Sequence, residues 1–405
     1  VAEDLYARGR GAYVIGLPLA DETERLAYIQ HLLQRPELLV RPGAAPPDLT
    51  DLLEVSPEVL AKQTNGLTRL QVGAIVRQAV QAREPISNRV ITCSKRRQIE
   101  TEIGDLVAFT MPRYGLEAVA GVGQQKELLL GTARALREGR TEVVPKGILL
   151  VGPPGCGKTF TMECFAHDCG IPFLELKNVF NKYVGATESN LEKLFHYLDA
   201  LAPVFLFIDE FDQSYGKRVA SDSDSGVSRR VFAMFNSFLS DESRQGRVMV
   251  GAATNRPDLV DASTLRAGRF DLKVPFLLPD AAAREAILRV TLDTLQVQAE
   301  SLDLSVFAAR TAGYSGADLK ELVRVAQRRS AFAGRDVVVQ DDLEFALEDY
   351  VPGGGLQQDH VRYMELLAVA ACTSRSLLPE PYREAVGTGV LQAELEKLRA
   401  KLLLG

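Results

Sequence analysis

Gly152-Pro-Pro-Gly-Cys-Gly-Lys-Thr159 is the stretch that decides the fold of this chain. It follows a short apolar run at 147–151, which is predicted to be a buried strand, and it leads into a segment predicted to be helical. Glycines let successive backbone N–H groups curl around a phosphate without a Cβ atom in the way. The stretch therefore predicts a phosphate-binding loop, and the residues expected to bind the nucleotide are Gly152, Pro153, Pro154, Gly155, Cys156, Gly157, Lys158, Thr159 and Phe160.

Two residues of this loop have distinct expected roles. Lys158 is expected to reach the β- and γ-phosphates, and the Thr159 hydroxyl is expected to ligate Mg²⁺. The helix that begins near Lys158 points the positive end of its dipole at the same phosphate oxygens. ATP and Mg²⁺ are therefore the expected cofactors.

A second apolar run, at 204–208, is followed directly by the acids Asp209 and Glu210. We expect Asp209 to hold Mg²⁺ through its water shell, and Glu210 to orient and polarise the attacking water. The alternative is an ordinary strand that ends in a solvated pair of acids. Beside a phosphate-binding loop, the catalytic interpretation is favoured.

The remaining apolar runs alternate with helical segments, which predicts an α/β fold: a P-loop NTPase parallel sheet with helices on both faces. After Pro279 the pattern becomes helical only, which predicts a small all-α lid domain. The other expected strands are at 173–176, 248–253 and 274–278, and the expected lid helices are at 281–295, 304–312, 315–331 and 340–350.

The front of the chain repeats part of this helical region. Residues 13–29 run parallel to residues 272–288, and in each copy a Pro and an Asp precede a helix that contains Arg25 or Arg284. Residues 63–79 run parallel to 310–326 in the same way. The repeat predicts that the front segment is a helical lid remnant of a degenerate first module, whose nucleotide-binding half is missing from this chain. Chance similarity between amphipathic helices is the alternative.

Two further motifs, Thr254-Asn-Arg-Pro-Asp258 and Leu265-Arg-Ala-Gly-Arg-Phe-Asp271, complete a set that resembles the AAA family, the ATPases associated with diverse cellular activities. The resemblance implies an ATP hydrolase in which Asn255 ends the fourth core strand, between the two strands that carry the Walker motifs, and positions the lytic water. It also implies that Arg266 and Arg269 reach the nucleotide site of a neighbouring subunit, where they would stabilise developing charge.

The same resemblance extends to the base and ribose end of the site. Residues 313–319 resemble the lid motif of the family, which implies that Gly316 and Ala317 approach the nucleotide. Val119 and Gly121 lie in a segment that resembles the one flanking adenine.

Residues 181–189 resemble the central-pore loop of relatives that thread proteins, and 216–227 would form a second pore-facing loop. A tyrosine ring offers apolar area to any side chain, so its grip on an extended peptide tolerates many sequences. A tyrosine packed under a loop is the alternative. The residues implied to grip substrate are Lys182, Tyr183, Val184 and Gly185.

Five parts follow from these patterns: a lid-like helical domain at 1–85, a linker at 86–111, the nucleotide-binding domain at 112–279, a helical lid at 280–351 and a C-terminal helical extension at 352–405. The degenerate front half and Ser228–Phe232 are similar to AAA proteins encoded in cyanobacteria and plastids. The leading hypothesis is a homo-oligomeric, hexameric ring that uses ATP to remodel or thread a protein substrate. An ATP-regulated assembly scaffold with slow turnover and a nucleic-acid-acting ATPase are the alternatives.

Composition agrees with this class. Hydrophobic residues make up 46% and charged residues 25%, as in ordinary globular proteins. The net charge of -6 argues against nucleic acid as the main partner. No run approaches the roughly 18 apolar residues of a membrane span, so no membrane partner is expected. The five cysteines form no C-x-x-C pair and the four histidines are scattered, so a reduced, cytoplasmic compartment without a metal cluster is expected.

Overall fold

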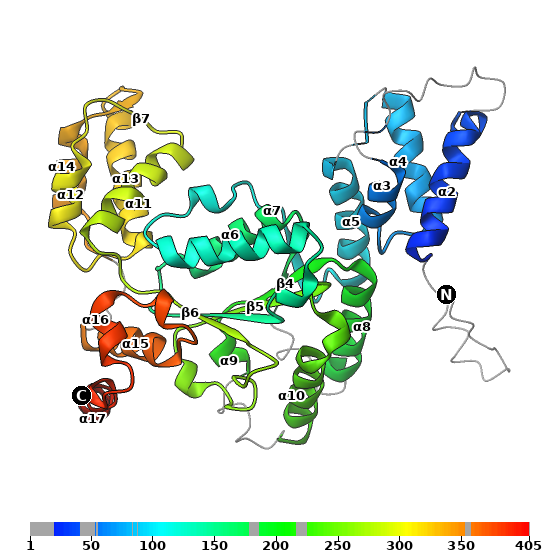
Figure 1. The fold of residues 1–405 in the computed structure, drawn as a ribbon. Coiled ribbons are helices and arrows are strands. Elements are labelled where there is room, and N and C mark those ends of the chain that lie inside the picture. Colours follow the sequence, from blue (N-terminus) through cyan, green and yellow to red (C-terminus); the bar gives the residue numbers. More distant parts are fainter. Residues whose placement is uncertain are drawn as a thin grey trace. The chain divides into compact units, whose positions relative to one another are not determined.

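The computed structural model describes residues 20–40, 53, 56–82, 84–86, 88–177, 186–215, 225–352 and 358–404, drawn in colour in Figure 1. These residues belong to two compact units. Unit 1 contains the chain up to Gln98 together with Ala200–Ala202, and unit 2 contains the rest. The expected pore residues Lys182, Tyr183, Val184 and Gly185, and most of the second loop at 216–227, lie outside the described residues.

Unit 2 is built on a six-stranded sheet in the order β1-β3-β4-β5-β2-β6. Strands β3, β4, β5, β2 and β6 pair in parallel with one another, and β2, β4 and β5 are buried along their whole length. Continuous apolar runs form such strands because helices cover both faces of the sheet. In chain order the strands are β1 (Val107–Thr110), β2 (Gly147–Val151), β3 (Phe173–Leu176), β4 (Val204–Ile208), β5 (Val248–Thr254) and β6 (Leu272–Pro275).

Strand β1 adds an antiparallel edge to the sheet that was predicted to be parallel. It pairs with β3, with Val107 opposite Leu176. Together with helix α5 (Asn88–Ile103) it occupies most of the segment that was expected to be a linker. A strand of four residues is too short to give a readable alternation of apolar and polar side chains. The last core strand also differs, since β6 runs from Leu272 to Pro275 and not from 274 to 278.

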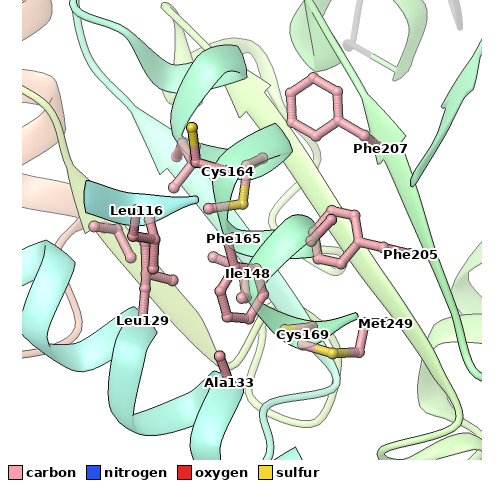
Figure 2. Close-up of a cluster of buried hydrophobic side chains, with 14 of the residues drawn as sticks. Leu116, Leu129, Ala133, Ile148, Cys164, Phe165, Cys169, Phe205, Phe207 and Met249 are labelled. Atoms are coloured by element: carbon pink, nitrogen blue, oxygen red, sulfur yellow. The ribbon is translucent and has the colours of Figure 1, made fainter. Parts of the chain in front are cut away.

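Helices α6 (Gly123–Arg137) and α7 (Lys158–Cys169) lie on one side of the sheet, and α9 (Phe211–Tyr215) and α10 (Ser225–Ser240) on the other (Figure 1). On the α7 side, the ring of Phe165 meets Phe205 edge-on at 5.8 Å between centroids (Figure 2). On the other side, Phe195 of α8 (Ala186–Leu201) stacks on Phe238 at 4.0 Å. Aromatic side chains therefore fill both faces of the core.

Cys164 and Cys169 are buried in the core on the α7 side (Figure 2). Burial raises the pKa of the Cys164 thiol to about 12 and raises the pKa of Cys169 as well. Both thiols therefore stay protonated at neutral pH, and the two residues fill apolar space.

The four predicted lid helices are present. They enclose a small core of their own, in which Leu288, Phe307 and Leu322 are fully buried. A two-stranded parallel sheet of β7 (Gln298–Ala299) and β8 (Val337–Val338), which was not predicted, joins the connections between them. The helices are α11 (Ala281–Thr294), α12 (Leu304–Arg310), α13 (Gly316–Phe332) and α14 (Gln340–Asp349).

Among the described residues of unit 1, the helices α2 (Glu22–Gln34), α3 (Pro57–Gln63) and α4 (Arg69–Ala82) repeat α11, α12 and α13. A buried arginine makes the same hydrogen bonds in both copies. Arg25 donates from Nε to the Ala61 carbonyl at 3.0 Å and from Nη1 to the Ala20 carbonyl. Arg284 donates to the corresponding carbonyls of Ala308 and Pro279, each at 2.8 Å. These shared bonds confirm the predicted repeat.

The turn that follows α3 matches the turn that follows α12. Thr64 donates from its hydroxyl to the Leu60 carbonyl at 2.7 Å, and Thr311 donates to the Phe307 carbonyl at 2.8 Å. The glycines after them, Gly66 and Gly313, have φ angles of 81° and 86°. Only glycine adopts such a left-handed turn without strain, so the repeat preserves both the hydrogen bond and the turn.

The C-terminal extension packs on the sheet of unit 2. Helix α15 (Gln358–Ala371) lies against β6 and β2 and contacts α17 (Val390–Leu404). The Lys273 N–H of β6 donates to the Thr373 hydroxyl at 3.0 Å, and Leu377 is buried in the core of the sheet. The extension therefore covers the edge strand β6.

Candidate functional site

A cavity of about 1370 Å³ lies in unit 2. It is bounded by the loop after β2, the residues that follow β4 and β5, the segment around η2 (Leu116–Ala118) and the lid helices α11 and α13. Ligands of open α/β sheets bind at the carboxyl ends of the strands, which is where this cavity lies. The predicted site residues that line it are Val119, Pro154, Gly155, Cys156, Gly157, Lys158, Thr159, Phe160, Asp209, Glu210, Asn255, Gly316 and Ala317.

The loop after β2 requires glycine for two different reasons. Gly155 and Gly157 have left-handed backbones, with φ angles of 79° and 83°. At Gly152 a Cβ atom would lie 1.8 Å from the carbonyl oxygen of Phe276, so no larger residue fits there. Gly152 and Pro153 do not line the cavity. Their contribution is made through their backbone carbonyls.

Those carbonyls hold the Lys158 ammonium group. Its Nζ donates to the carbonyls of Gly152 at 2.8 Å and Pro153 at 2.7 Å, and to the Asn255 side-chain oxygen at 2.8 Å. Burial lowers the pKa of Lys158 to about 8, and the nearby carboxylate of Asp209 opposes this shift. Lys158 is therefore largely charged at neutral pH and lies at the first turn of α7, whose N-terminal dipole also attracts anions.

Thr159 and Asp209 are also brought together. The Thr159 hydroxyl donates to Asp209 Oδ2 at 2.8 Å. Hydroxyl and carboxylate oxygens suit Mg²⁺, which usually takes one or two protein ligands and completes its shell with water and substrate phosphate oxygens. The pair therefore fits the magnesium role that the sequence predicts for it.

Glu210 lines the cavity with an unusual backbone. Its φ angle is 47°, a left-handed value that is rare for residues other than glycine. Its N–H donates to Asp209 Oδ1 at 2.8 Å, which ties the two acids together. A non-glycine residue in this region costs about 1–3 kcal/mol, and such strain concentrates at functional sites.

The loop after β5 is fixed on the core side by Asp212, which sequence reasoning missed. The Thr254 hydroxyl donates to Asp212 Oδ1 at 2.6 Å, and the Arg256 N–H donates to the Thr254 hydroxyl at 3.0 Å. Asn255 lies between these two residues, at the end of the strand between β4 and β2, as predicted. Asp212 continues the acidic pattern that begins at Asp209, and that pattern was the available signal.

The opposite end of the cavity is apolar. Ile287 and Val290 of α11 line it together with Val119, whose carbonyl accepts from Lys126 Nζ at 3.1 Å. Gly121 does not line the cavity. Its φ angle is 80°, and a Cβ atom there would lie 3.0 Å from the Cβ of Ala283, so this glycine allows the loop to approach α11.

The lid touches the phosphate-binding loop directly. The Ala317 N–H donates to the Gly155 carbonyl at 3.0 Å, and a Cβ atom on Gly316 would lie 3.2 Å from the same carbonyl oxygen. The helix starts here because Ser315 and Asp318 form a capping box. Small residues at the start of α13 therefore allow this close contact between lid and core.

Arg266 and Arg269 do not line the cavity of their own chain. The Arg266 side chain is exposed. Arg269 donates to the Ser240 hydroxyl at 3.0 Å and to the Ser263 carbonyl.

Other cavity residues left no readable signal in the sequence. Tyr114 donates from its hydroxyl to the Thr294 carbonyl of α11 at 3.0 Å. Glu175 lies in β3, and its pKa is raised, mainly by burial and further by the charge of Asp209. Isolated tyrosines and glutamates are common on protein surfaces, so only the fold identifies these two as neighbours of the site.

Two structural findings concern other kinds of site. Within the part of the chain that the structure describes, no three His, Cys, Asp or Glu side chains are grouped so as to hold a metal ion. Among the described helices, none combines the length and the apolar character that crossing a bilayer requires.

Three family models match the chain. The model of the ATPase family associated with various cellular activities (AAA) matches residues 148–278, which contain the cavity-forming strands. A model of the AAA+ lid domain matches residues 301–345. A model of the second helical domain of AAA+ chaperones matches residues 23–104, which include the helices of unit 1.

Curated relatives are similar over the same region. The chain is 37% identical over 252 residues to the ATP-dependent zinc metalloprotease FtsH of Pseudothermotoga lettingae, which covers 60% of this chain and 40% of that protein. It is 38% identical over 216 residues to FtsH 2 of Symbiobacterium thermophilum, covering 52% of this chain and 36% of the relative. The chain is 36% identical over 259 residues to FtsH of Acidobacterium capsulatum, which covers 61% of this chain and 40% of that protein. The aligned part thus spans about two fifths of the length of these relatives.

Proposed function

Because this chain belongs to the AAA family of ATPases and hydrolyses ATP, we propose that it is a ring-forming motor that remodels or threads a protein substrate. The observation that carries the proposal is the meeting of Lys158, Glu210 and Asn255 in one cavity beside a lid. A chain that bound ATP only to assemble a scaffold would have no need of the water-activating acid.

The residues of the cavity divide the proposed chemistry among them. Lys158 exchanges its hydrogen bonds with loop carbonyls for bonds to phosphate oxygens, because these carry full negative charge. Thr159 directly, and Asp209 through water, would hold Mg²⁺, whose charge would offset that of the phosphates. Glu210 accepts a proton from the attacking water, and the Asn255 amide orients that water.

The two arginines supply the argument for a ring. Arg266 and Arg269 lie away from the cavity of their own chain, yet developing charge on the transferred phosphoryl group needs a cation near it. We propose that each subunit provides these arginines to its neighbour, which makes turnover depend on assembly, and that the ring is a hexamer. Closed rings follow from such head-to-tail contacts when the rotation between subunits closes.

Protein is the proposed substrate class. The similar proteins are ATP-dependent zinc metalloproteases, and their names describe ATP-dependent action on proteins. The Lys182–Gly185 loop is proposed to grip the substrate in a central pore. We also propose that residues 1–85 form a lid-like helical domain of a degenerate first module.

A defined unfolding assay tests the motor. A fluorescent reporter protein with an unstructured tail is mixed with the chain and ATP, and loss of fluorescence reports unfolding. Tyr183→Ala should abolish unfolding and leave ATP turnover nearly unchanged. Its melting temperature should also stay close to the parental value, because a surface substitution costs within about 0.5 kcal/mol, whereas truncating a buried aromatic costs about 3–5 kcal/mol.

Three results would count against parts of this proposal. A parental chain that hydrolyses ATP and leaves every tailed reporter folded would favour the scaffold. A Tyr183→Ala chain that melts far below the parental chain would assign Tyr183 to packing. Tight binding of single-stranded DNA that weakens steeply with salt would favour the nucleic-acid alternative.

A further inference from the structure

Tyr363, on helix α15 of the C-terminal extension, packs against the loop that follows β5. Its side chain is almost fully buried, with 7% of its surface exposed. Its hydroxyl lies 3.5 Å from Asp258 Oδ2, and the Arg256 guanidinium lies 5.5 Å from the centre of its ring. The ring therefore borders the loop that carries Asn255.

Arg256 and Asp258 form a rigid pair beneath that ring. Arg256 donates from Nε to Asp258 Oδ1 at 2.9 Å and from Nη2 to Oδ2 at 2.8 Å. The hydrogen bond to Asp258 is the largest cause that raises the pKa of Arg256, so the arginine stays charged. The two parallel hydrogen bonds to Asp258 fix the orientation of the Arg256 guanidinium. The ring of Tyr363 attracts the same guanidinium from another side.

The pair is linked to Asn255 through the backbone. The Arg256 N–H donates to the Thr254 hydroxyl at 3.0 Å, and Asn255 lies between the two residues. The side-chain oxygen of Asn255 in turn accepts from Lys158 at 2.8 Å. A shift of Arg256 would therefore change the backbone on one side of Asn255. The side-chain amide of Asn255 would then move relative to the phosphate-binding loop.

We propose that Tyr363 is a positioning residue for ATP hydrolysis, which holds the Arg256–Asp258 pair so that Asn255 stays aligned with Lys158. The family models match no residue beyond 345, so this role adds the C-terminal extension to the hydrolytic machinery. The inference rests on ATP hydrolysis and not on the proposed motor. A chain that hydrolyses ATP and unfolds no protein would refute the motor and leave this proposal intact.

A double-mutant cycle tests the coupling. Tyr363→Leu should lower kcat by about tenfold and change KM less than about twofold, because a misplaced catalytic group slows chemistry more than it weakens binding. In an Asn255→Ala chain, the same change should lower kcat less than about twofold further, because the group that Tyr363 positions is already gone. Tyr363→Met is made in parallel. It also removes the ring but packs differently from leucine, so poor packing of one side chain does not decide the result.

Tyr382 provides a matched control in the same extension. The Arg362 guanidinium also lies 5.5 Å from the centre of its ring. Arg362 donates to the Tyr382 hydroxyl and to Glu394, and not to the loop after β5. Tyr382→Leu should leave kcat within about twofold of the parental value. Tyr363→Phe, which keeps the ring, should restore most of the activity that Tyr363→Leu loses.

The proposal would be overturned by equal losses of kcat from Tyr363→Leu in the parental and Asn255→Ala backgrounds. A loss from Tyr382→Leu as large as that from Tyr363→Leu would overturn it too, since the effect would then come from general loosening of the extension. A change confined to KM would show that Tyr363 affects nucleotide binding and not the alignment of Asn255.

Discussion

The Asn255 side-chain oxygen accepts a hydrogen bond from the Lys158 ammonium at 2.8 Å, which connects the loop after β5 to the phosphate-binding loop. Lys158 gives its other two hydrogen bonds to loop carbonyls. Phosphate oxygens compete for the same protons and carry more negative charge than an amide oxygen. Nucleotide binding would therefore weaken this hydrogen bond. The loop after β5 would still hold the Asn255 amide beside Lys158, where it would be free to orient the attacking water as proposed.

Replacement of Lys158 or Glu210 should separate binding from hydrolysis. Lys158→Ala removes the buried cation and should abolish nucleotide binding in a fluorescence titration. Glu210→Gln should bind ATP and lose about 10²–10⁴-fold in turnover, which is the usual contribution of a general base. Glu142→Gln, an exposed glutamate outside the cavity, is the control. Hydrolysis at the parental rate by Glu210→Gln would refute the assignment of the base.

Nucleotide binding should be coupled to proton uptake above pH 8. Burial lowers the pKa of Lys158 to about 8 in the free protein, and phosphate must raise it because it favours the charged ammonium. Affinity should therefore be flat below about pH 8 and fall by up to about tenfold per pH unit above it. Titration of ADP between pH 7 and 9.5 measures the slope. Lys158→Arg, whose guanidinium stays charged, should bind without this fall, and a flat parental profile would contradict the lowered pKa.

Mixed subunits should reveal whether the arginines act between chains. Arg269→Ala chains keep an intact cavity, and Lys158→Ala chains keep both arginines. Mixing the two inactive variants should restore part of the ATP turnover, because some interfaces then pair an intact cavity with an intact arginine. Arg289→Ala, which changes an exposed arginine of the lid, is the control and should stay active alone. No recovery at any mixing ratio would count against supply by a neighbour.

The repeated arginines should each be important for stability. Arg25→Met and Arg284→Met leave two backbone carbonyls without their charged donor, and one of these carbonyls is deeply buried in each copy. We expect each variant to lose about 2–4 kcal/mol in the free energy of unfolding, measured by urea titration. Arg289→Met, which breaks an exposed ion pair with Glu285, should cost less than about 1 kcal/mol. Equal losses from Arg284→Met and Arg289→Met would contradict this account.

Acid should weaken the lid through Asp342. The hydrogen bond from Arg335, helped by the Val339 N–H, lowers the pKa of this carboxyl, whose side chain has no exposed surface. Because the pKa of Asp342 is lower in the folded lid than in the unfolded chain, its ionised carboxylate stabilises the lid fully above the unfolded pKa of about 3.9. This stabilisation is lost as the pH falls through the lower pKa of the folded lid. Asp342→Asn should therefore lower the melting temperature most at pH 7. The difference from the parental chain should shrink below pH 4, and a constant difference would exclude this mechanism.

Much of the site could be predicted from the sequence because its chemistry lies in short, contiguous motifs. The phosphate-binding loop, the acids after β4 and the position of Asn255 are fixed by neighbours within a few residues. The lid repeat could be found for a similar reason, since Arg25 and Arg284 occupy equivalent places in two copies of one pattern. In these cases the local pattern and the fold agree.

Other features depend on contacts between distant segments. Tyr363 and Asp258 are 105 positions apart, and nothing near either residue indicates that they meet. Strand β1 is defined by its pairing with β3 and not by its own four residues. The close approach of the Gly121 backbone to Ala283 of α11 likewise joins segments that are distant in the sequence. The roles of Arg266 and Arg269 require a second subunit, so a single chain leaves them as predictions.

The left-handed backbone of Glu210 has an evolutionary consequence. Glycine, asparagine or aspartate would adopt this conformation more easily, so backbone preference alone would not select a glutamate here. If Glu210 is the catalytic base proposed above, selection for turnover would retain it against that preference. In a lineage where hydrolysis ceased to matter, we expect this position to drift toward those three residues before the buried strand ahead of it changes. The residue found here in other lineages would then record whether they still hydrolyse ATP.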